Sequence, residues 1–139
     1  MRSLPVFILS LTLLASSACD KQSTAPTALG SSGLYLYTGY DSSAIIVATG
    51  TMHFARLDSV IAGERNLTGS GPEAGSGPFS GSVSSYGTIT ILFPSQQIGG
   101  LYLRGKQTDS HITGERYIDI GARFPGIKVG TFRIIPVFL

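Results

Sequence analysis

The strongest constraint on the fold is the alternation of apolar and polar side chains in short runs from Gly33 onward. The runs are separated by Gly, Pro, Ser and Asp, residues that favour turns. We find no segment with the 3.6-residue period of an amphipathic helix. The runs are residues 34–37, 44–48, 51–57, 59–67, 79–83, 88–93, 101–104, 111–120 and 131–137. The pattern therefore predicts an all-β domain of eight or nine short strands.

The short connections between these runs restrict the topology. A parallel strand pair needs a crossover of a dozen or more residues, whereas strands this close in sequence pair as antiparallel hairpins. A single antiparallel meander has two exposed edges, and closing it into a barrel removes both. We therefore predict an eight-stranded up-and-down β-barrel, with a two-sheet β-sandwich as the alternative. A barrel of this size is either filled by side chains or holds one small ligand.

An internal repeat marks two of the expected strands. Residues 58–65 (DSVIAGER) match residues 109–116 (DSHITGER) at six of eight positions. Each copy predicts an Asp-Ser turn that opens a strand with a glycine inside it, at Gly63 and Gly114. Such a glycine indicates a bulge, a bend or the close approach of another backbone. We interpret both glycines as structural.

The repeat also supplies the candidate ligand-binding residues, Arg65 and Arg116. Strict alternation places each arginine on the strand face that carries the apolar residues. If that face points inward, each guanidinium needs a carboxylate, carbonyl groups or a ligand, because an unpaired buried charge is strongly destabilising. The alternative is a bulge at Gly63 and Gly114, which shifts the alternation by one residue and turns the arginines outward.

The N-terminal residues predict export. Met1 and Arg2 give a positive start, residues 4–14 form an apolar run, and the small residues 15–18 precede Cys19, the only cysteine. This order of segments is typical of a secretory signal. The apolar run has about eleven residues, fewer than the ~20 that a transmembrane helix needs.

Residues 15–19 (ASSAC) resemble the lipobox of bacterial lipoproteins, with Ser16 where that family usually has leucine. The resemblance implies that residues 1–19 are a signal peptide ending at Cys19, which carries several acyl chains such as palmitate. Several chains hold a protein stably on a membrane, whereas one holds it weakly. The implied location is the bacterial cell envelope, on a membrane and facing the periplasm or the cell exterior. Ordinary cleavage after Ala18 is the alternative.

Residues 20–32 are small and polar without periodicity, which is typical of a flexible tether. Residues 33–139 therefore form the expected domain.

In the predicted hairpins of this domain an apolar residue stands two places before a glycine, as Ile61 stands before Gly63. This rhythm resembles that of avidin-like and lipocalin-like barrels, the calycin group. The resemblance implies a barrel, and no site residues are carried over from it.

Composition and motifs argue against nucleic-acid binding and catalysis. Without Arg2 of the signal, nine Lys and Arg stand against eight Asp and Glu, and no basic cluster is present. His53 and His111 lack metal-ligand spacing, so we expect no metal and no cofactor. The repeated carboxylates Glu64 and Glu115 are the remaining candidates for the acid and base of a hydrolase-like site.

We therefore expect a lipid-anchored envelope protein that binds a small apolar or anionic ligand inside the barrel without catalysis. The alternative is a structural or interaction protein with a side-chain-filled barrel that contacts another envelope protein. A cavity of ~300 Å³ or more with convergent polar groups favours the ligand, and a solid core favours the interaction protein.

Overall fold

The structure is a computed structural model that describes residues 31–94, 100–108, 110–119 and 126–137. The predicted signal with Cys19, the predicted tether up to residue 30, and Asp109 of the second repeat lie outside the described residues. Within the described ranges, no helix has the length and apolar character needed to cross a membrane.

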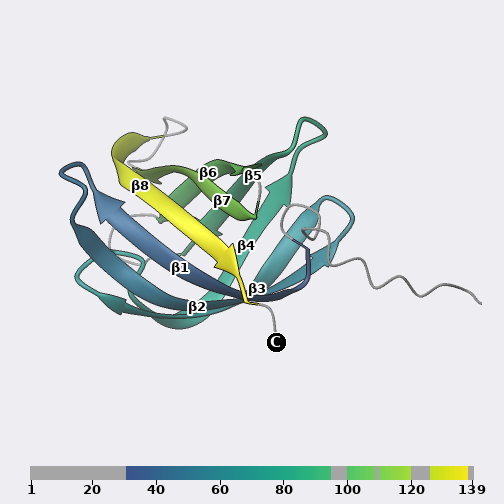
Figure 1. The fold of residues 1–139 in the computed structure, drawn as a ribbon, viewed down its shortest axis with the longest axis horizontal. Coiled ribbons are helices and arrows are strands. Elements are labelled where there is room, and N and C mark those ends of the chain that lie inside the picture. Colours follow the sequence, from purple (N-terminus) through teal and green to yellow (C-terminus); the bar gives the residue numbers. More distant parts are fainter. Residues whose placement is uncertain (1–30, 95–99, 109, 120–125, 138–139) are drawn as a thin grey trace, which may run out of the picture.

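Eight antiparallel strands follow one another around a closed barrel, and β8 pairs with β1 (Figure 1). This arrangement confirms the predicted all-β, eight-stranded up-and-down barrel. The strands are β1 (Gly33–Asp41), β2 (Ile46–Leu57), β3 (Val60–Gly69), β4 (Gly75–Val83), β5 (Thr88–Phe93), β6 (Leu101–Thr108), β7 (His111–Ile118) and β8 (Ile127–Pro136).

The strand bounds differ from the predicted ones where glycine interrupts the side-chain pattern. The predicted runs 44–48 and 51–57 belong to one strand, which begins at Ile46, because β2 continues through Gly50, which pairs with Leu67 on β3. Similarly, β4 begins at Gly75 rather than at Phe79, since its glycine- and serine-rich start pairs with β3. Glycine has no side chain to alternate, so these pairings left no signal in the apolar pattern.

One face of every strand points into a packed core. The buried apolar residues are Tyr35, Tyr37, Ala48, Met52, Phe54, Ile61, Leu67, Phe79, Val83, Ile89, Ile91, Phe93, Leu101, Leu103, Ile112, Phe132 and Ile134. In β1, Tyr35 and Tyr37 point inward and Leu36 is exposed. A buried tyrosine needs a hydrogen-bond partner for its hydroxyl. Both tyrosines have one, since Tyr35 donates to the Ser31 carbonyl and Tyr37 donates to Glu73.

A chain of aromatic rings fills the middle of the barrel. Ring centroids are 4.4 Å apart for Tyr35 and Phe54, 5.2 Å for Phe54 and Phe79, and 6.0 Å for Phe79 and Phe93. Tyr37 continues the chain at 6.0 Å from Phe93. These separations are those of direct aromatic contacts. The rings therefore form a core that joins β1, β2, β4 and β5 across the interior.

The two repeat glycines occupy equivalent places on opposite sides of the barrel, since β3 and β7 are four strands apart. Strand pairing runs through both glycines without a shift in register, so the predicted bulge is wrong. Gly63 pairs with Phe79 on the next strand, and Gly114 pairs with Phe132 on its next strand. Each repeat thus places a glycine beside an inward-pointing phenylalanine.

Close approach of the neighbouring backbone explains why these positions are glycine. A Cβ at Gly63 would lie 1.8 Å from the His53 carbonyl oxygen and 2.8 Å from Cζ of Phe79. A Cβ at Gly114 would lie 2.0 Å from the Arg104 carbonyl oxygen. Of the three interpretations of the repeat glycines, the structure supports close approach.

Candidate functional site

The two ends of the barrel differ. At the loop end, β1, β3, β5 and β7 finish and β2, β4, β6 and β8 begin, and the connections described there are 42–45 and 70–74. At the hairpin end the chain enters β1, β8 ends, and the other three connections turn back (Figure 1). The candidate site derived from Arg65 and Arg116 is at the loop end.

The connection between β3 and β4 places Glu73 inside the barrel. Its side chain is fully buried, although it stands on a loop rather than on a strand. Oε1 accepts a hydrogen bond of 2.9 Å from Tyr37 Oη, and Oε2 forms an ion pair of 2.7 Å with Arg116 Nη2. A Cβ at Gly39 or Gly71 would lie 2.6 Å from one of these carboxylate oxygens. The two glycines therefore leave the space that the carboxylate occupies.

Arg116 points inward from β7 and is 2% exposed. Besides Glu73, it contacts the backbone of β1, where Nη1 donates to the Tyr40 carbonyl at 2.8 Å. Among the described residues, its Nε is a buried nitrogen without a hydrogen-bond partner. The buried charge is thus neutralised by a carboxylate of the same chain, one of the partners that the sequence required of an inward-pointing arginine.

Arg65 points inward from β3 and is only half-buried. Its Nε donates to the backbone carbonyl of Glu73 at 3.1 Å, and Nη1 donates to the Pro78 carbonyl at 2.7 Å. The guanidinium lies over the Phe93 ring, 5.2 Å from the centroid, within cation–π range. Burial lowers the pKa of Arg65, against the nearby carboxylates Glu64 and Glu73, which raise it.

The two arginines therefore hold the same loop from opposite sides of the barrel. Arg65 binds the backbone of Glu73, and Arg116 binds its carboxylate. A guanidinium fixed on a strand is a rigid donor to a carboxylate, and the charge strengthens the hydrogen bond. The network ties the β3–β4 loop across the loop end, and both guanidinium groups are bound there by groups of this chain.

The pKa of Tyr37 is raised well above its ordinary value, first by burial and then by the negative charge of Glu73. Because the folded-state pKa exceeds the unfolded-state pKa of about 10, stability is retained in full below that pH and is lost as the pH rises further. In an absorbance titration at 295 nm, we expect Tyr37 to ionise only when the barrel unfolds. This late step should be absent from Tyr37→Phe.

Tyr117→Phe is the matched control for this titration. A hydrogen bond to Glu115 raises the pKa of Tyr117, but this tyrosine is on the surface. The control should keep the late step that accompanies unfolding. Ionisation of Tyr37 while the barrel is still folded would contradict its assignment to the buried network.

The repeated carboxylates Glu64 and Glu115 are not brought together. They point outward from β3 and β7, on opposite sides of the barrel. Glu115 accepts hydrogen bonds from Tyr117 and from Lys128, the latter at 3.0 Å. The Tyr117 hydrogen bond and then the Lys128 hydrogen bond lower the pKa of Glu115. An acid–base pair made of Glu64 and Glu115 therefore has no geometric basis.

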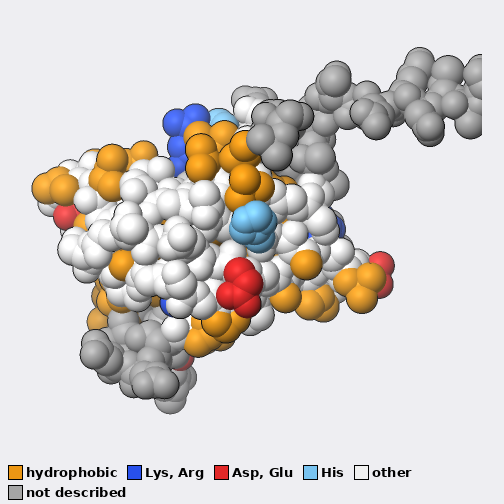
Figure 2. All heavy atoms as spheres, turned by 90° about the horizontal axis from the view of Figure 1, so that it is seen from below, with side chains coloured by type: hydrophobic (Ala, Val, Ile, Leu, Met, Phe, Trp, Pro, Cys, Tyr) orange, Lys and Arg blue, Asp and Glu red, His pale blue; other side chains and the backbone are white. Residues whose placement is uncertain are grey.

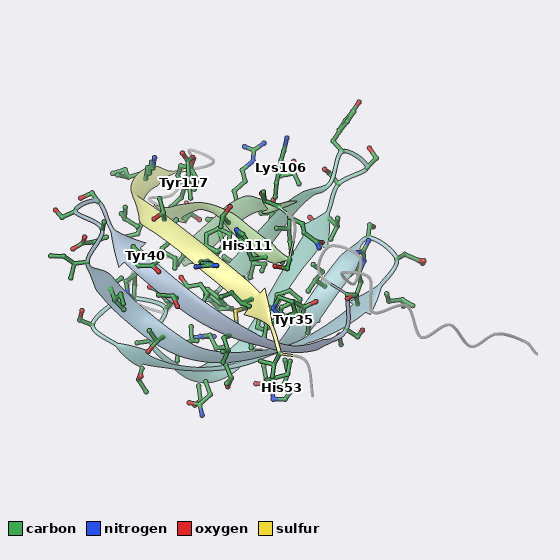
Figure 3. All side chains as sticks on the ribbon, in the orientation of Figure 1. Tyr35, Tyr40, His53, Lys106, His111 and Tyr117 are labelled. Carbon is green, nitrogen blue, oxygen red and sulfur yellow. The ribbon has the colours of Figure 1, made fainter. Side chains whose placement is uncertain are left out.

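The histidines do not form part of a metal-binding group in the described part of the chain. His53 lies on the lower face of the barrel and His111 on a different strand (Figure 3). No cluster of three or more His, Cys, Asp or Glu side chains is placed to hold a metal ion among the residues described.

Sequence reasoning missed Glu73 and Tyr37. Glu73 lies in a Gly-Pro-Glu-Ala segment without alternation, so nothing local indicated that it is buried. The sequence held only an indirect signal for Glu73. Two inward-pointing arginines require a buried acceptor, and Glu73 is an acidic residue in the loop that follows the strand of Arg65. The tyrosines of β1 alternate with leucines, and hydrophobicity alone does not decide which of the two faces inward.

Two depressions in the described surface lie outside the barrel. One, of about 560 Å³, spans β5, β6 and β7, with Arg104 and Lys106 on one side and Glu115 and Tyr117 on the other. Lys106 and Tyr117 project from the upper side of the barrel in Figure 3. The second, of about 360 Å³, lies beside the β1–β2 turn and the start of β8. Both are open to solvent and neither is lined by the core residues.

No protein-family model and no curated protein matches this sequence.

Proposed function

We propose that this protein is a lipid-anchored component of the cell envelope, acylated at Cys19, whose filled barrel contacts another envelope protein without catalysis. The packing of the interior carries this proposal. Aromatic and aliphatic side chains occupy the space that a carrier barrel would leave for its ligand. The second expectation from the sequence, an interaction protein with a side-chain-filled barrel, fits this packing better than a ligand carrier.

The partners of the two arginines support the same choice. An anionic ligand inside the barrel would have to displace Glu73 from Arg116 and the β3–β4 loop from Arg65. By contrast, the depression over β5–β7 is open and carries both charge signs, on Arg104, Lys106 and Glu115. Paired charges of this kind suit the polar rim of a protein–protein contact.

The anchor is tested by Cys19→Ala. We expect this variant to appear in the soluble envelope fraction or as unprocessed precursor, because it lacks the residue that carries the acyl chains. Cell fractionation and metabolic labelling with a radioactive fatty acid measure this, with Ser17→Ala as the control that should remain labelled and membrane-bound. Fatty-acid label on the Cys19→Ala protein would refute acylation at this cysteine.

The mode of binding is tested on wild-type protein extracted from membranes. Under native mass spectrometry, we expect the mass of the acylated chain without a non-covalent small molecule. In intact cells, a photoreactive residue at Lys106 should give one defined protein adduct, whereas the same residue at exposed Thr49 on β2 should not. A small molecule that is released when the barrel unfolds would favour the ligand carrier instead.

A further inference from the structure

The hairpin end carries exposed apolar side chains on two separate turns. Leu57 and Val60 face each other across the last pair of the β2–β3 hairpin and are 77% and 57% exposed. Tyr86, in the turn between β4 and β5, is 89% exposed. Both hairpins project to the right in Figure 1, at the end where β1 begins. We call these three residues the apolar rim.

The outer face of the β2–β3 hairpin is apolar only near its tip. Ala55 and Ala62 form the next outward-facing pair and are also exposed, and the following pair is His53 with Glu64. Hydrophobic side chains reach the right-hand edge of the underside in Figure 2, the side of the hairpin end. The outer face of this hairpin is therefore apolar over the two outward-facing pairs nearest the tip and carries ionisable side chains at the next outward-facing pair.

The chain enters the barrel beside this rim. Tyr35 Oη donates to the Ser31 carbonyl at 2.7 Å, and the Arg56 backbone amide donates to Ser32 Oγ at 2.9 Å. Arg56 immediately precedes Leu57, so the entering chain is fixed next to the β2–β3 tip. Eleven residues lie between Cys19 and Ser31. A chain of that length reaches at most about 40 Å even when fully extended, so acyl chains on Cys19 would keep the hairpin end close to the membrane surface.

We propose that the hairpin end faces the membrane and that Leu57, Val60 and Tyr86 insert into the headgroup region of the bilayer that holds Cys19. This inference rests on the proposed lipid anchor. Apolar side chains gain free energy by leaving water at the acyl boundary, and the amphipathic tyrosine ring suits the membrane interface. Insertion orients the barrel, so that the loop end with the β3–β4 loop points away from the bilayer.

The loop end provides the competing surface. Ile45, Ile46 and Ile127 are exposed there, beside Asp41 and Lys128. The chain from Cys19 does not enter at that end, so a membrane contact there would require the barrel to turn over on its tether. The two ends can be distinguished directly because the chain contains no tryptophan.

The test uses the acylated full-length protein, purified from membranes and reconstituted into vesicles of phosphatidylethanolamine and phosphatidylglycerol. Tyr86→Trp reports on the hairpin end and Ile46→Trp on the loop end. We expect the emission of Tyr86→Trp to shift to the blue and to be quenched by brominated lipid, whereas Ile46→Trp keeps the emission of a water-exposed indole. Quenching of Ile46→Trp instead of Tyr86→Trp would overturn the proposed orientation.

A second variant separates the rim from the anchor. Leu57→Asp with Val60→Asp, in the Tyr86→Trp background, should still sediment with the vesicles through its acyl chains, while quenching by brominated lipid falls at least tenfold. Both changes are on exposed side chains, and an unchanged circular dichroism spectrum confirms the fold. If the variant with both aspartates sediments but is quenched as strongly as its Tyr86→Trp parent, insertion of the apolar rim is wrong and the anchor is unaffected. Tyr86→Trp protein that fails to sediment overturns the anchor and the orientation together.

Discussion

Replacing Glu73 with alanine should lower the free energy of unfolding by about 3–5 kcal/mol, the cost typical of breaking a buried ion pair from one side. Arg116 would keep its charge at 2% exposure without a carboxylate, and the Tyr37 hydroxyl would lose its acceptor. Urea unfolding followed by circular dichroism measures the loss. Glu64→Ala, an exposed glutamate of the repeat, is the control and should change stability by less than ~0.5 kcal/mol.

The double variant Glu73→Leu with Arg116→Met should recover most of this loss. Removing both charges replaces an ion pair by apolar side chains of similar size, which is often neutral or stabilising. A double variant as unstable as the sum of the two single variants would show that the pair is not the main interaction of either residue.

Arg65→Ala should lower the free energy of unfolding by less than Arg116→Ala, because Arg65 is half-exposed and its hydrogen-bond acceptors are carbonyl groups.

Alanine at Gly63 or Gly114 should destabilise the barrel by about 3 kcal/mol, at the upper end of the usual cost of overpacking. The new Cβ would lie 1.8 Å from a carbonyl oxygen at Gly63 and 2.0 Å from one at Gly114. In both cases the obstacle is backbone of the neighbouring strand, so relief requires the two strands to separate. The same urea unfolding experiment measures the change.

Gly87→Ala is the matched control, because it separates backbone strain from steric contact. Gly87 has a φ of +80°, and a Cβ there would meet no atom within 4 Å. We expect a loss of about 1 kcal/mol, the cost of a left-handed backbone for a residue with a Cβ. Equal losses for Gly63→Ala and Gly87→Ala would show that close approach is not what the repeat glycines provide.

The alternation of apolar and polar residues predicted most of the fold because successive side chains of a strand point to opposite faces. Core-facing residues of a barrel strand therefore recur at every second position of the sequence. In β5, the inward residues Ile89, Ile91 and Phe93 are the alternate residues of one run, and all are buried. Short connections then left antiparallel hairpins as the simplest pairing, and closure removed the free edges. The Asp58-Ser59 turn likewise placed the first copy of the repeat at a hairpin, and both repeat glycines lie on inward positions.

The candidate site was predicted in part. Sequence reasoning left two directions open for Arg65 and Arg116, inward by strict alternation or outward through a bulge. The structure decides for the inward direction, because strand pairing runs through both glycines without a shift in register. Their partners were not predictable in the same way. Which acidic residue reaches an inward arginine depends on the path of a loop, and the β3–β4 loop has no periodic pattern that fixes its path.

The sequence by itself therefore determined the strand class, the meander and the structural role of the two repeat glycines, because all of these follow from local periodicity and turn chemistry. Only the tertiary structure decided that both repeat arginines point inward, that Tyr35 and Tyr37 of β1 face the core, and that Glu73 enters the barrel, where Arg116 on β7 meets it. Tyr37, Glu73 and Arg116 are far apart in the sequence, and their stabilising contacts exist only once the barrel has closed and brought β1, the β3–β4 loop and β7 together.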